Sequence, residues 1–305
     1  SDDQTARFYK IIAVTSTILV LLMSVDFSKV LSKFTSGGED DSATGEFYCL
    51  PIFACAGLMW MASATDLVSI FVSLELVTIS FYVMVAFMRR NVGSLEAGVK
   101  YLILGALSTG FLVYGIAWIY GAMGTTDITL YNSILESGAY HLNYLLFGIA
   151  LILLALGFKV GAVPMQLWIA DVYQGAPTPI TAFLSVASKA AGFLVLMTIL
   201  SPFLAADATS STVSSILLIM AGATLLYGNL AAISQNNFKR LLAYSSIAHA
   251  GFLLIGVATQ DYNAVSFYLG TYLLMTFAAF FVLALIRSEE DSDELEAFDG
   301  LGKRN

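Results

Sequence analysis

Long apolar segments, each about the length needed to cross a membrane, dominate this chain. A membrane-spanning helix needs ~20 mostly apolar residues, because a rise of about 1.5 Å per residue must cover a hydrocarbon core of roughly 30 Å. By that measure the sequence predicts an all-α polytopic membrane protein with about nine spans. The predicted spans lie near residues 8–25, 47–63, 67–88, 98–121, 142–174, 177–203, 212–233, 238–258 and 264–287.

Composition supports a membrane protein, since 58% of the 305 residues are hydrophobic and only 12% are charged. A soluble domain carries about 25% charged residues. Much of the net charge of -8 comes from acidic residues at 38–41 and 288–300, which we interpret as a solvated loop and a solvated tail. No long basic or glycine-rich phosphate-binding segment is present, so we expect no nucleic-acid or nucleotide partner.

The two ends of the chain and its basic residues bear on topology. The chain opens without a methionine or a basic leader and stops soon after an apolar segment, so we expect both ends to be cuts within a longer protein. Alternating spans place Arg7 and Lys10 on one side and a larger basic group on the other. That group is Lys29, Lys33, Arg89, Arg90, Lys239, Arg240, Arg287, Lys303 and Arg304. The positive-inside rule predicts that the larger group faces the cytoplasm, or the matrix or stroma of an organelle, and that residue 1 lies outside. A bacterial cytoplasmic (inner) membrane is the favoured location.

The remaining three of the fourteen basic residues, Lys100, Lys159 and Lys189, fall inside predicted spans, as does Glu75. A charge at the bilayer centre costs at least ~2.5 kcal/mol on insertion scales, so these groups must pair, meet water or lose their charge. One interpretation is a static buried ion pair that fixes helix packing. We favour a chain of titratable sites for ion movement, because buried ion pairs rarely stabilise relative to apolar replacements. For Lys100, a side chain that snorkels to the interface or pairs with Glu96 one turn earlier is an equal alternative.

The segment 142–174 is too long for one straight helix and contains Pro164. A proline inside a helix removes one backbone hydrogen bond and clashes with the preceding turn. We therefore predict two half-helices with a break from Gly161 to Pro164, directly after Lys159.

Other polar residues in or near the spans allow two interpretations each. His249 is either a structural histidine or a member of a proton relay with the serines one turn earlier. Asp171 either caps a neighbouring helix, which we favour, or lines a cytoplasmic access route for protons. Trp168 and Tyr173 are predicted to anchor the interface. We predict no metal site, because Cys49 and Cys55 lack metal-ligand spacing and read as small core residues.

Four stretches together resemble the antiporter-like membrane subunits of respiratory complex I, and the resemblance covers nearly the whole chain. They are SLEL…FYVMVAF, SLEAGVKYLILGALSTGFLVYGIAWIYGAMGTT, FKVGAVPMQLWIADVYQGAPTPITAFLSVASKAAGF and NLAAISQNNFKRLLAYSSIAHAGFLLIG. Within that group, DVYQGAPTPITAFLSVASK is similar to the N-type subunit, whereas the L-type and M-type subunits and Mrp antiporters have a different pattern there. Two positions depart from the family: Ala170 replaces a usual proline, and Gln166 replaces a common histidine.

The resemblance implies a fold of two inverted five-helix repeats, each with a broken helix. Residues 8–46 would be a leading helix and loop, 47–203 the first repeat, and 212–305 an incomplete second repeat. It also implies roles for five residues. Glu75 matches the family's essential glutamate, and Lys159 its broken-helix lysine. Lys100 matches a modulating lysine, Lys189 the lysine that links two half-channels, and His249 a histidine of N-type subunits.

The implied function is proton translocation within an H⁺-translocating NADH:quinone oxidoreductase. This chain would hold no cofactor, since NADH, FMN, iron–sulfur clusters and quinone would bind to partner subunits. Its partners would be other complex I membrane subunits, including further antiporter-like ones, together with lipid and protons. The alternative is a subunit of an Mrp-type cation/proton antiporter.

Overall fold

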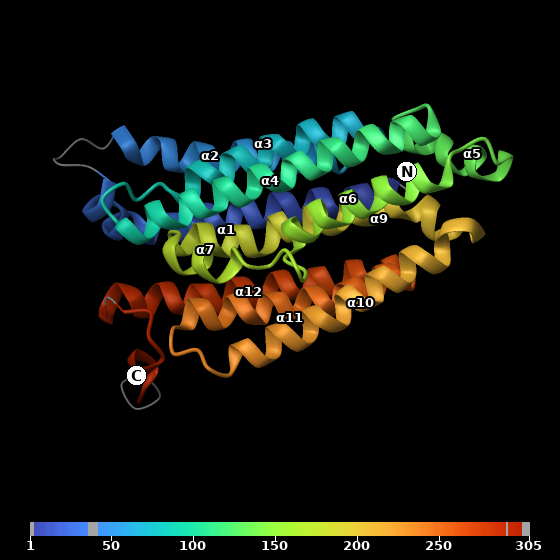
Figure 1. Ribbon diagram of the computed structural model, residues 1–305. Helices are drawn as coiled ribbons and strands as arrows, with labels where there is room; N and C mark the ends of the chain where they lie inside the picture. The colour runs from blue at the N-terminus through green and yellow to red at the C-terminus, as the bar shows by residue number, and fades with distance from the viewer. Residues whose placement is uncertain (1–2, 36–41, 291, 301–305) are drawn as a thin grey trace.

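Long helices that run along one common direction form this protein (Figure 1). The computed structural model describes residues 3–35, 42–290 and 292–300. In that part of the chain, eight helices are long and apolar enough to cross a membrane, and the apolar helix Gly45–Met61 is slightly shorter. The helices are α1 (Asp3–Thr35), α2 (Ser42–Met61), α3 (Leu67–Val85), α4 (Val92–Met123), α5 (Tyr131–Ser137), α6 (Leu142–Val160), α7 (Ile169–Gly175), α8 (Thr178–Phe183), α9 (Lys189–Ala205), α10 (Asp207–Ala232), α11 (Phe238–Ala258) and α12 (Tyr262–Glu290). The protein is an integral, multi-pass membrane protein, and the prediction of its fold class is confirmed.

Each of the nine predicted apolar segments coincides with a helix or a pair of helices. Segment 142–174 divides into α6 and α7, and segment 177–203 divides into α8, a short π-helical stretch and α9. The continuous run from Thr178 to Ala205 lies at the centre of the bundle, with 94% of its most apolar window buried, against 22% for α10. The helix that carries Lys189 is therefore surrounded by protein.

Small residues let neighbouring helices approach closely. On α4, a Cβ atom added to Gly115 would lie 2.8 Å from Cγ1 of Ile152 and 3.0 Å from the carbonyl oxygen of Gly148 on α6. A Cβ atom on Gly148 would in turn meet the backbone of Ile119 at 3.0 Å. Helices α4 and α6 are therefore in backbone contact, which fixes their position relative to each other.

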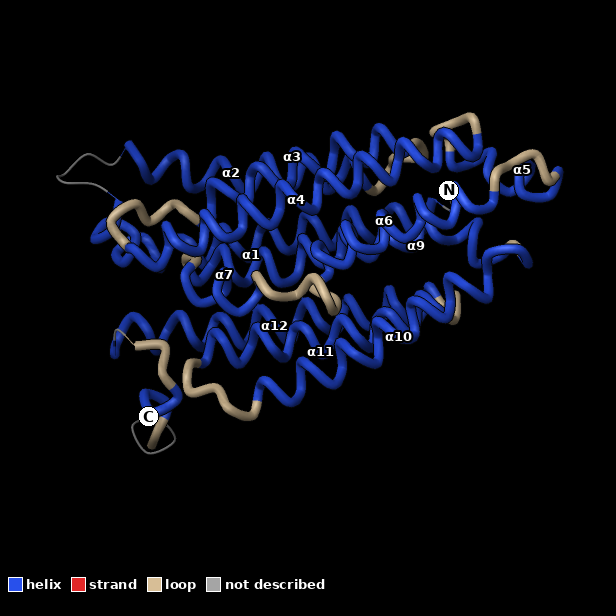
Figure 2. Tube along the Cα trace, in the orientation of Figure 1, coloured by secondary structure: helices blue, strands red, loops and turns tan. Residues whose placement is uncertain are grey.

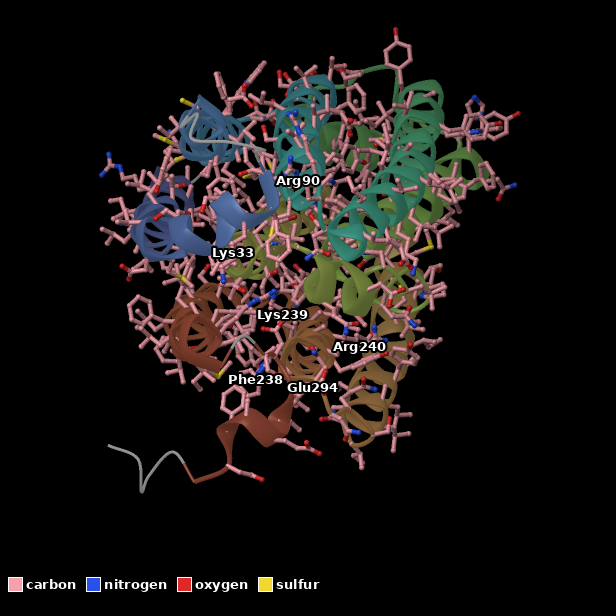
Figure 3. The ribbon with its side chains drawn as sticks, turned by 90° about the vertical axis from the view of Figure 1, so that its left-hand side faces the viewer. Lys33, Arg90, Phe238, Lys239, Arg240 and Glu294 are labelled. Atoms are coloured by element: carbon pink, nitrogen blue, oxygen red, sulfur yellow. The ribbon has the colours of Figure 1, made fainter. Side chains whose placement is uncertain are left out.

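Basic residues of the described chain gather at one end of the bundle, as the alternation of spans predicts. Figure 3 looks onto that end and shows Lys33, Arg90, Lys239 and Arg240 there. Lys303, Arg304 and the acidic residues 38–41 lie outside the described residues. Figure 1 places the start of α1 at the opposite end.

The predicted solvated tail at residues 288–300 is not a free tail in the part that follows α12, although Glu294, Glu296 and Asp299 there are exposed. The amide of Phe238 donates to the carbonyl of Asp293 (2.8 Å), and the amide of Leu295 donates to the carbonyl of Asn236 (2.8 Å). Asn237 and Glu294 form an isolated β-bridge, and the rings of Phe238 and Phe298 are 4.6 Å apart. This turn, residues 292–298, therefore folds back onto the start of α11.

Side-chain caps fix where several helices begin, and Asp66 at the start of α3 is one of them. Its Oδ1 accepts from the amides of Val68 (2.8 Å) and Ser69 (3.2 Å), and its Oδ2 accepts from the hydroxyl of Thr126 (2.6 Å). Partial burial raises the pKa of this carboxyl, but the hydrogen bonds from Thr126, Ser69 and Val68 outweigh burial and leave the pKa below its ordinary value. Asp66 thus joins the start of α3 to the loop after α4.

Replacing Asp66 with alanine is expected to lower the free energy of unfolding by about 1 kcal/mol, the usual loss for an N-cap. Because the native pKa is depressed, the carboxylate stabilises the protein above its unfolded-state pKa, and this stabilisation is lost as the pH falls through the native pKa. Asp66→Asn keeps a capping oxygen, so it should match the wild type more closely at neutral pH and lack this pH dependence. Thermal unfolding in detergent at several pH values measures both effects, and equal stability of Asp66→Ala and wild type would contradict them.

Candidate functional site

The helix break predicted at residues 161–164 is confirmed. Helix α6 ends at Val160, and Gly161 follows in the left-handed region with φ 80°. The amides of Gly161 and Ala162 both donate to the carbonyl of Gly157, at 2.9 and 2.8 Å. Figure 2 shows the connecting loop in the middle of the bundle, with α6 on one side and α7 on the other. The chain therefore crosses with an interruption part-way through.

Two hydrogen bonds hold this loop in place. The amide of Val163 donates to Oγ1 of Thr224 on α10 (3.0 Å), and Nε1 of Trp168 donates to the carbonyl of Phe158 (2.9 Å). Inside a membrane, irregular backbone is tolerated only where protein or water satisfies its polar groups. These contacts supply partners for two of the backbone groups that the break releases from the helical pattern.

Lys159 lies in the last turn of α6, directly beside the break, and its side chain is buried. Its Nζ donates to the hydroxyl of Thr78 on α3, and that hydroxyl donates to the carbonyl of Leu74 (2.6 Å). Glu75 lies one turn before Thr78, and its Oε1 accepts from the hydroxyl of Thr109 on α4 (2.8 Å). In the described structure Glu75 and Lys159 are thus joined to hydroxyl groups on neighbouring helices, without an ion pair between them.

Lys189 is also buried, with 3% of its surface exposed, and the helical turn directly before it is irregular. A π-helical stretch, Leu184–Ser188, comes immediately before it, a feature that often occurs at functional sites. Nζ of Lys189 donates to the carbonyl and the hydroxyl of Ser246 on α11, and it lies 5.3 Å from the centre of the Tyr272 ring. Tyr272 and Ser185 are joined through their hydroxyls (2.8 Å).

The structure brings Lys159 and Lys189 onto adjoining helices. Gly192 lies one turn after Lys189, and a Cβ atom added there would be 3.4 Å from Cβ of Lys159 and 2.8 Å from Cγ1 of Val160. The close contact between α6 and α9 therefore depends on the absence of a side chain at Gly192.

His249 extends this polar group along α11. It follows Ser246 by one turn, its Nδ1 is 2.6 Å from the hydroxyl of Tyr268, and its ring is 5.2 Å from the ring of Tyr272. His249 and Lys189 therefore flank Tyr272. Each of the two lies eleven residues after the start of its helical run, about 16 Å along the axis from the same end of the bundle.

Lys100 and Asp171 lie elsewhere, in one group with Arg240, which Figure 3 shows at the basic end of the bundle. Nζ of Lys100 is 2.7 Å from Glu96 and 2.7 Å from Asp171, and Nη1 of Arg240 is 2.8 Å from the other oxygen of Asp171. The pairing of Lys100 with Glu96, one of the alternatives that the sequence left open, is therefore present. The prediction that Asp171 caps a neighbouring helix is wrong, because its carboxylate accepts from the side chains of α4 and α11 and ties both helices to α7.

Two further sequence interpretations change. Trp168 and Tyr173 are buried in the core, where Tyr173 bonds to Ser246 (3.2 Å), so they are not interfacial anchors. Cys49 is exposed on the bundle surface and Cys55 is partly exposed, so neither is a core residue. Within the described ranges no cluster of three or more histidine, cysteine, aspartate or glutamate side chains is placed to bind a metal.

The sequence and fold of this chain are similar to those of known proteins. Residues 64–305 match the family of transmembrane proteins described as NADH:quinone oxidoreductase/Mrp antiporter. The chain belongs to this family. The match spans well over half of the chain and includes the break, Lys159, Lys189 and His249.

Individual relatives are similar over nearly all of the chain. It is 40% identical to NADH-quinone oxidoreductase subunit N 2 of Chloroherpeton thalassium, over 99% of this chain and 59% of that protein. A chain of respiratory complex I from Thermus thermophilus, solved with bound aureothin, aligns with a TM-score of 0.80 and 33% identity, over 99% of this chain and 62% of that one. A chain of the Mrp complex from Dietzia sp. DQ12-45-1b shares the fold, with a TM-score of 0.78, 22% identity and coverage of 94% and 52%. The resemblance of this family member to N-type subunits is confirmed, and it spans about three fifths of the length of those relatives.

Substituting Gly192 with alanine is expected to push α6 and α9 apart, since the new methyl group would lie 2.8 Å from Val160. Overpacking of this kind typically costs about 1–3 kcal/mol. The double variant Gly192→Ala with Val160→Ala should recover much of the loss, because it removes the atom that the methyl group meets. Thermal unfolding of the three proteins measures this, and a single variant as stable as wild type would show that the contact is loose.

Proposed function

We propose that this chain is a proton-translocating membrane subunit of an NADH:quinone oxidoreductase, with Lys159 and Lys189 as successive proton-carrying groups. The observation that carries the proposal is the pair of buried lysines on adjoining helices beside a broken helix. Both ammonium groups are bonded to neutral oxygens rather than to carboxylates. A buried lysine without a permanent counter-charge can alternate between its charged and neutral forms.

Glu75 is proposed to control the first lysine. Thr78, which bonds to Lys159, lies one turn from Glu75 on the same helix, so the carboxylate needs only a local rearrangement to reach the ammonium group. An ion pair would keep Lys159 protonated. Separation, with Glu75 bonded to Thr109 as in the described structure, would favour release of the proton.

From Lys159 the proton would pass to Lys189, and then to His249 through the polar groups between them. Ser246 contacts Lys189 and precedes His249 by one turn, and Tyr272 lies against both. Water at the break near Gly161 and Pro164 would bridge the first gap. Lys100 would act at the end of the bundle, where its pairing with Asp171 and Glu96 modulates access from that side.

The enzyme activity would belong to the whole complex, with no redox centre in this chain. NADH, FMN, iron–sulfur clusters and quinone would be bound by partner subunits, and further antiporter-like subunits would lie beside this one. The basic end of the bundle would face the cytoplasm of a bacterium, with residue 1 on the outer side. An Mrp-type antiporter is the second candidate on the strength of the shared fold, but 40% identity to a subunit N favours the oxidoreductase.

Replacing Lys159 with alanine in the intact complex is expected to abolish or strongly reduce proton pumping, because the first proton-carrying group is lost. Proton uptake into membrane vesicles during quinone reduction measures this. Arg89→Gln, which removes an exposed charge at the basic end, should leave pumping unchanged. If pumping and quinone reduction both survive in Lys159→Ala, the relay through this residue is wrong.

Glu75→Gln tests the control step separately. The amide keeps the size of the side chain and can still accept from Thr109, but it cannot form an ion pair with Lys159. Pumping should fall about as much as in Lys159→Ala, while the amount of assembled complex stays at the wild-type level. Wild-type pumping in Glu75→Gln would exclude the carboxylate as the controlling group.

A further inference from the structure

Lys239 is a third buried lysine, and the proposed relay through Lys159 and Lys189 does not include it. It lies in the first turn of α11, at the basic end of the bundle, and its side chain is 0% exposed (Figure 3). From its position in the sequence, Lys239 reads as one of the charges that face the cytoplasm. A fully buried lysine is rare unless it is paired, so its surroundings indicate what it does.

The side chain of Lys239 has few partners. Its Nζ donates to the carbonyl of Ala176, at the end of α7 (3.0 Å), and lies 3.7 Å from Oδ2 of Asp293. That same oxygen accepts a shorter bond from Nη1 of Arg287 (2.8 Å). One carboxylate thus serves two cations. Oδ1 of Asp293 and Nε of Arg287 are buried without a hydrogen-bond partner, so the cluster is incompletely satisfied.

Asp293 is held there by the turn that follows α12. Backbone hydrogen bonds join Asp293 to Phe238 and Leu295 to Asn236, and the side chain of Asn237 donates to Glu294 (3.1 Å). A shift of this turn on α11 would therefore carry the carboxylate away from Lys239. Because Lys239 also bonds to the end of α7, such a shift would change the contacts of the second half of the broken helix.

The cluster lies between a cavity and the relay. A cavity of about 290 Å³ at this end is lined by Lys100, Asp171 and Gln174 and reaches Arg287. That volume has room for several water molecules. On the other side, Ser246 follows Lys239 by seven residues, which places it on the same face of α11 and about 10 Å deeper. Ser246 is the residue that binds Lys189.

We propose that Lys239 is a further proton-exchange group, which passes protons between the cavity at the basic end and the Ser246–Lys189 site, and that Asp293 positions it. This inference rests on the proposed function of the chain. With Asp293 close, Lys239 carries the proton as an ammonium group. When the turn moves away, the ammonium group gives its proton to water and becomes a neutral amine, and it is recharged from the other side.

Charged groups from each neighbouring element surround this site and enter its response to pH. They are Asp171 on α7, Arg240 on α11, Arg287 on α12, and Asp293 and Glu294 in the turn.

Two substitutions of Lys239 separate proton exchange from a static charge. Lys239→Gln leaves the Asp293–Arg287 bond in place and can still donate to Ala176, so the complex should assemble. Lys239→Arg keeps the positive charge, but a guanidinium group does not release its proton in proteins. We expect both variants, within the intact complex, to lose most proton pumping per quinone reduced. Pumping at the wild-type level in either variant overturns the proposal.

Matched measurements keep the test decisive. Lys33→Gln removes an exposed lysine at the same end and should pump like the wild type. If Lys239→Arg does not assemble, the pH dependence of residual pumping in Lys239→Gln decides. Pumping that decreases at alkaline pH in the same way as in the wild type overturns the proposal. Pumping that lacks this decrease supports it. Loss of pumping in Lys159→Ala together with normal pumping in both Lys239 variants would leave the proposed function standing and remove only this inference.

Discussion

The structure depends on satisfying the backbone groups released where α6 stops inside the membrane. Hydrocarbon offers no hydrogen bonds, so an unpaired amide or carbonyl at that depth costs several kcal/mol. The indole of Trp168 and the hydroxyl of Thr224 supply partners from within the protein. Those two contacts require Trp168 to be buried and α10 to lie against the loop. The break, and the polar surroundings of Lys159 with it, therefore exist only because distant parts of the chain pack around them.

Neutral oxygens, rather than carboxylates, are the nearest partners of both central lysines. The hydroxyls of Thr78 and Ser246 solvate an ammonium group without fixing its charge, since each hydroxyl can donate or accept a hydrogen bond, and the ring of Tyr272 lies beside Lys189. Carboxylates lie one step further away, or at the end of the bundle with Asp171 and Asp293. The interior is thus arranged so that losing a proton leaves no unpaired carboxylate beside a neutral lysine.

The sequence predicted the spans, the break at Gly161–Pro164 and the central placement of Lys159 and Lys189, because proline chemistry and apolar length act locally. It could not predict partners that depend on packing. Asp171 was predicted to cap a helix because its partner Arg240 lies 69 positions away in the chain, and a pairing over that separation cannot be identified from sequence spacing. Lys239 looked exposed because burial of its side chain depends on the turn at Asp293, which looked like a solvated tail. The π-helical stretch could not be predicted either, because the residues from Ser185 to Ser188 show no sequence pattern that distinguishes a π-helix from an α-helix.

That π-helical stretch makes spacing, as well as side-chain chemistry, a requirement of the site. Each residue added to or removed from a helix rotates everything beyond it by about 100°. Leu184–Ser188 absorbs such an offset, so that Ser185 can meet Tyr272 while Lys189 still meets Ser246. An insertion or deletion in the regular helix beyond this stretch, between Lys189 and Gly192, would turn Gly192 away from α6 with every functional side chain still present. Between Lys189 and Gly192, the length of the chain is therefore as constrained as its composition.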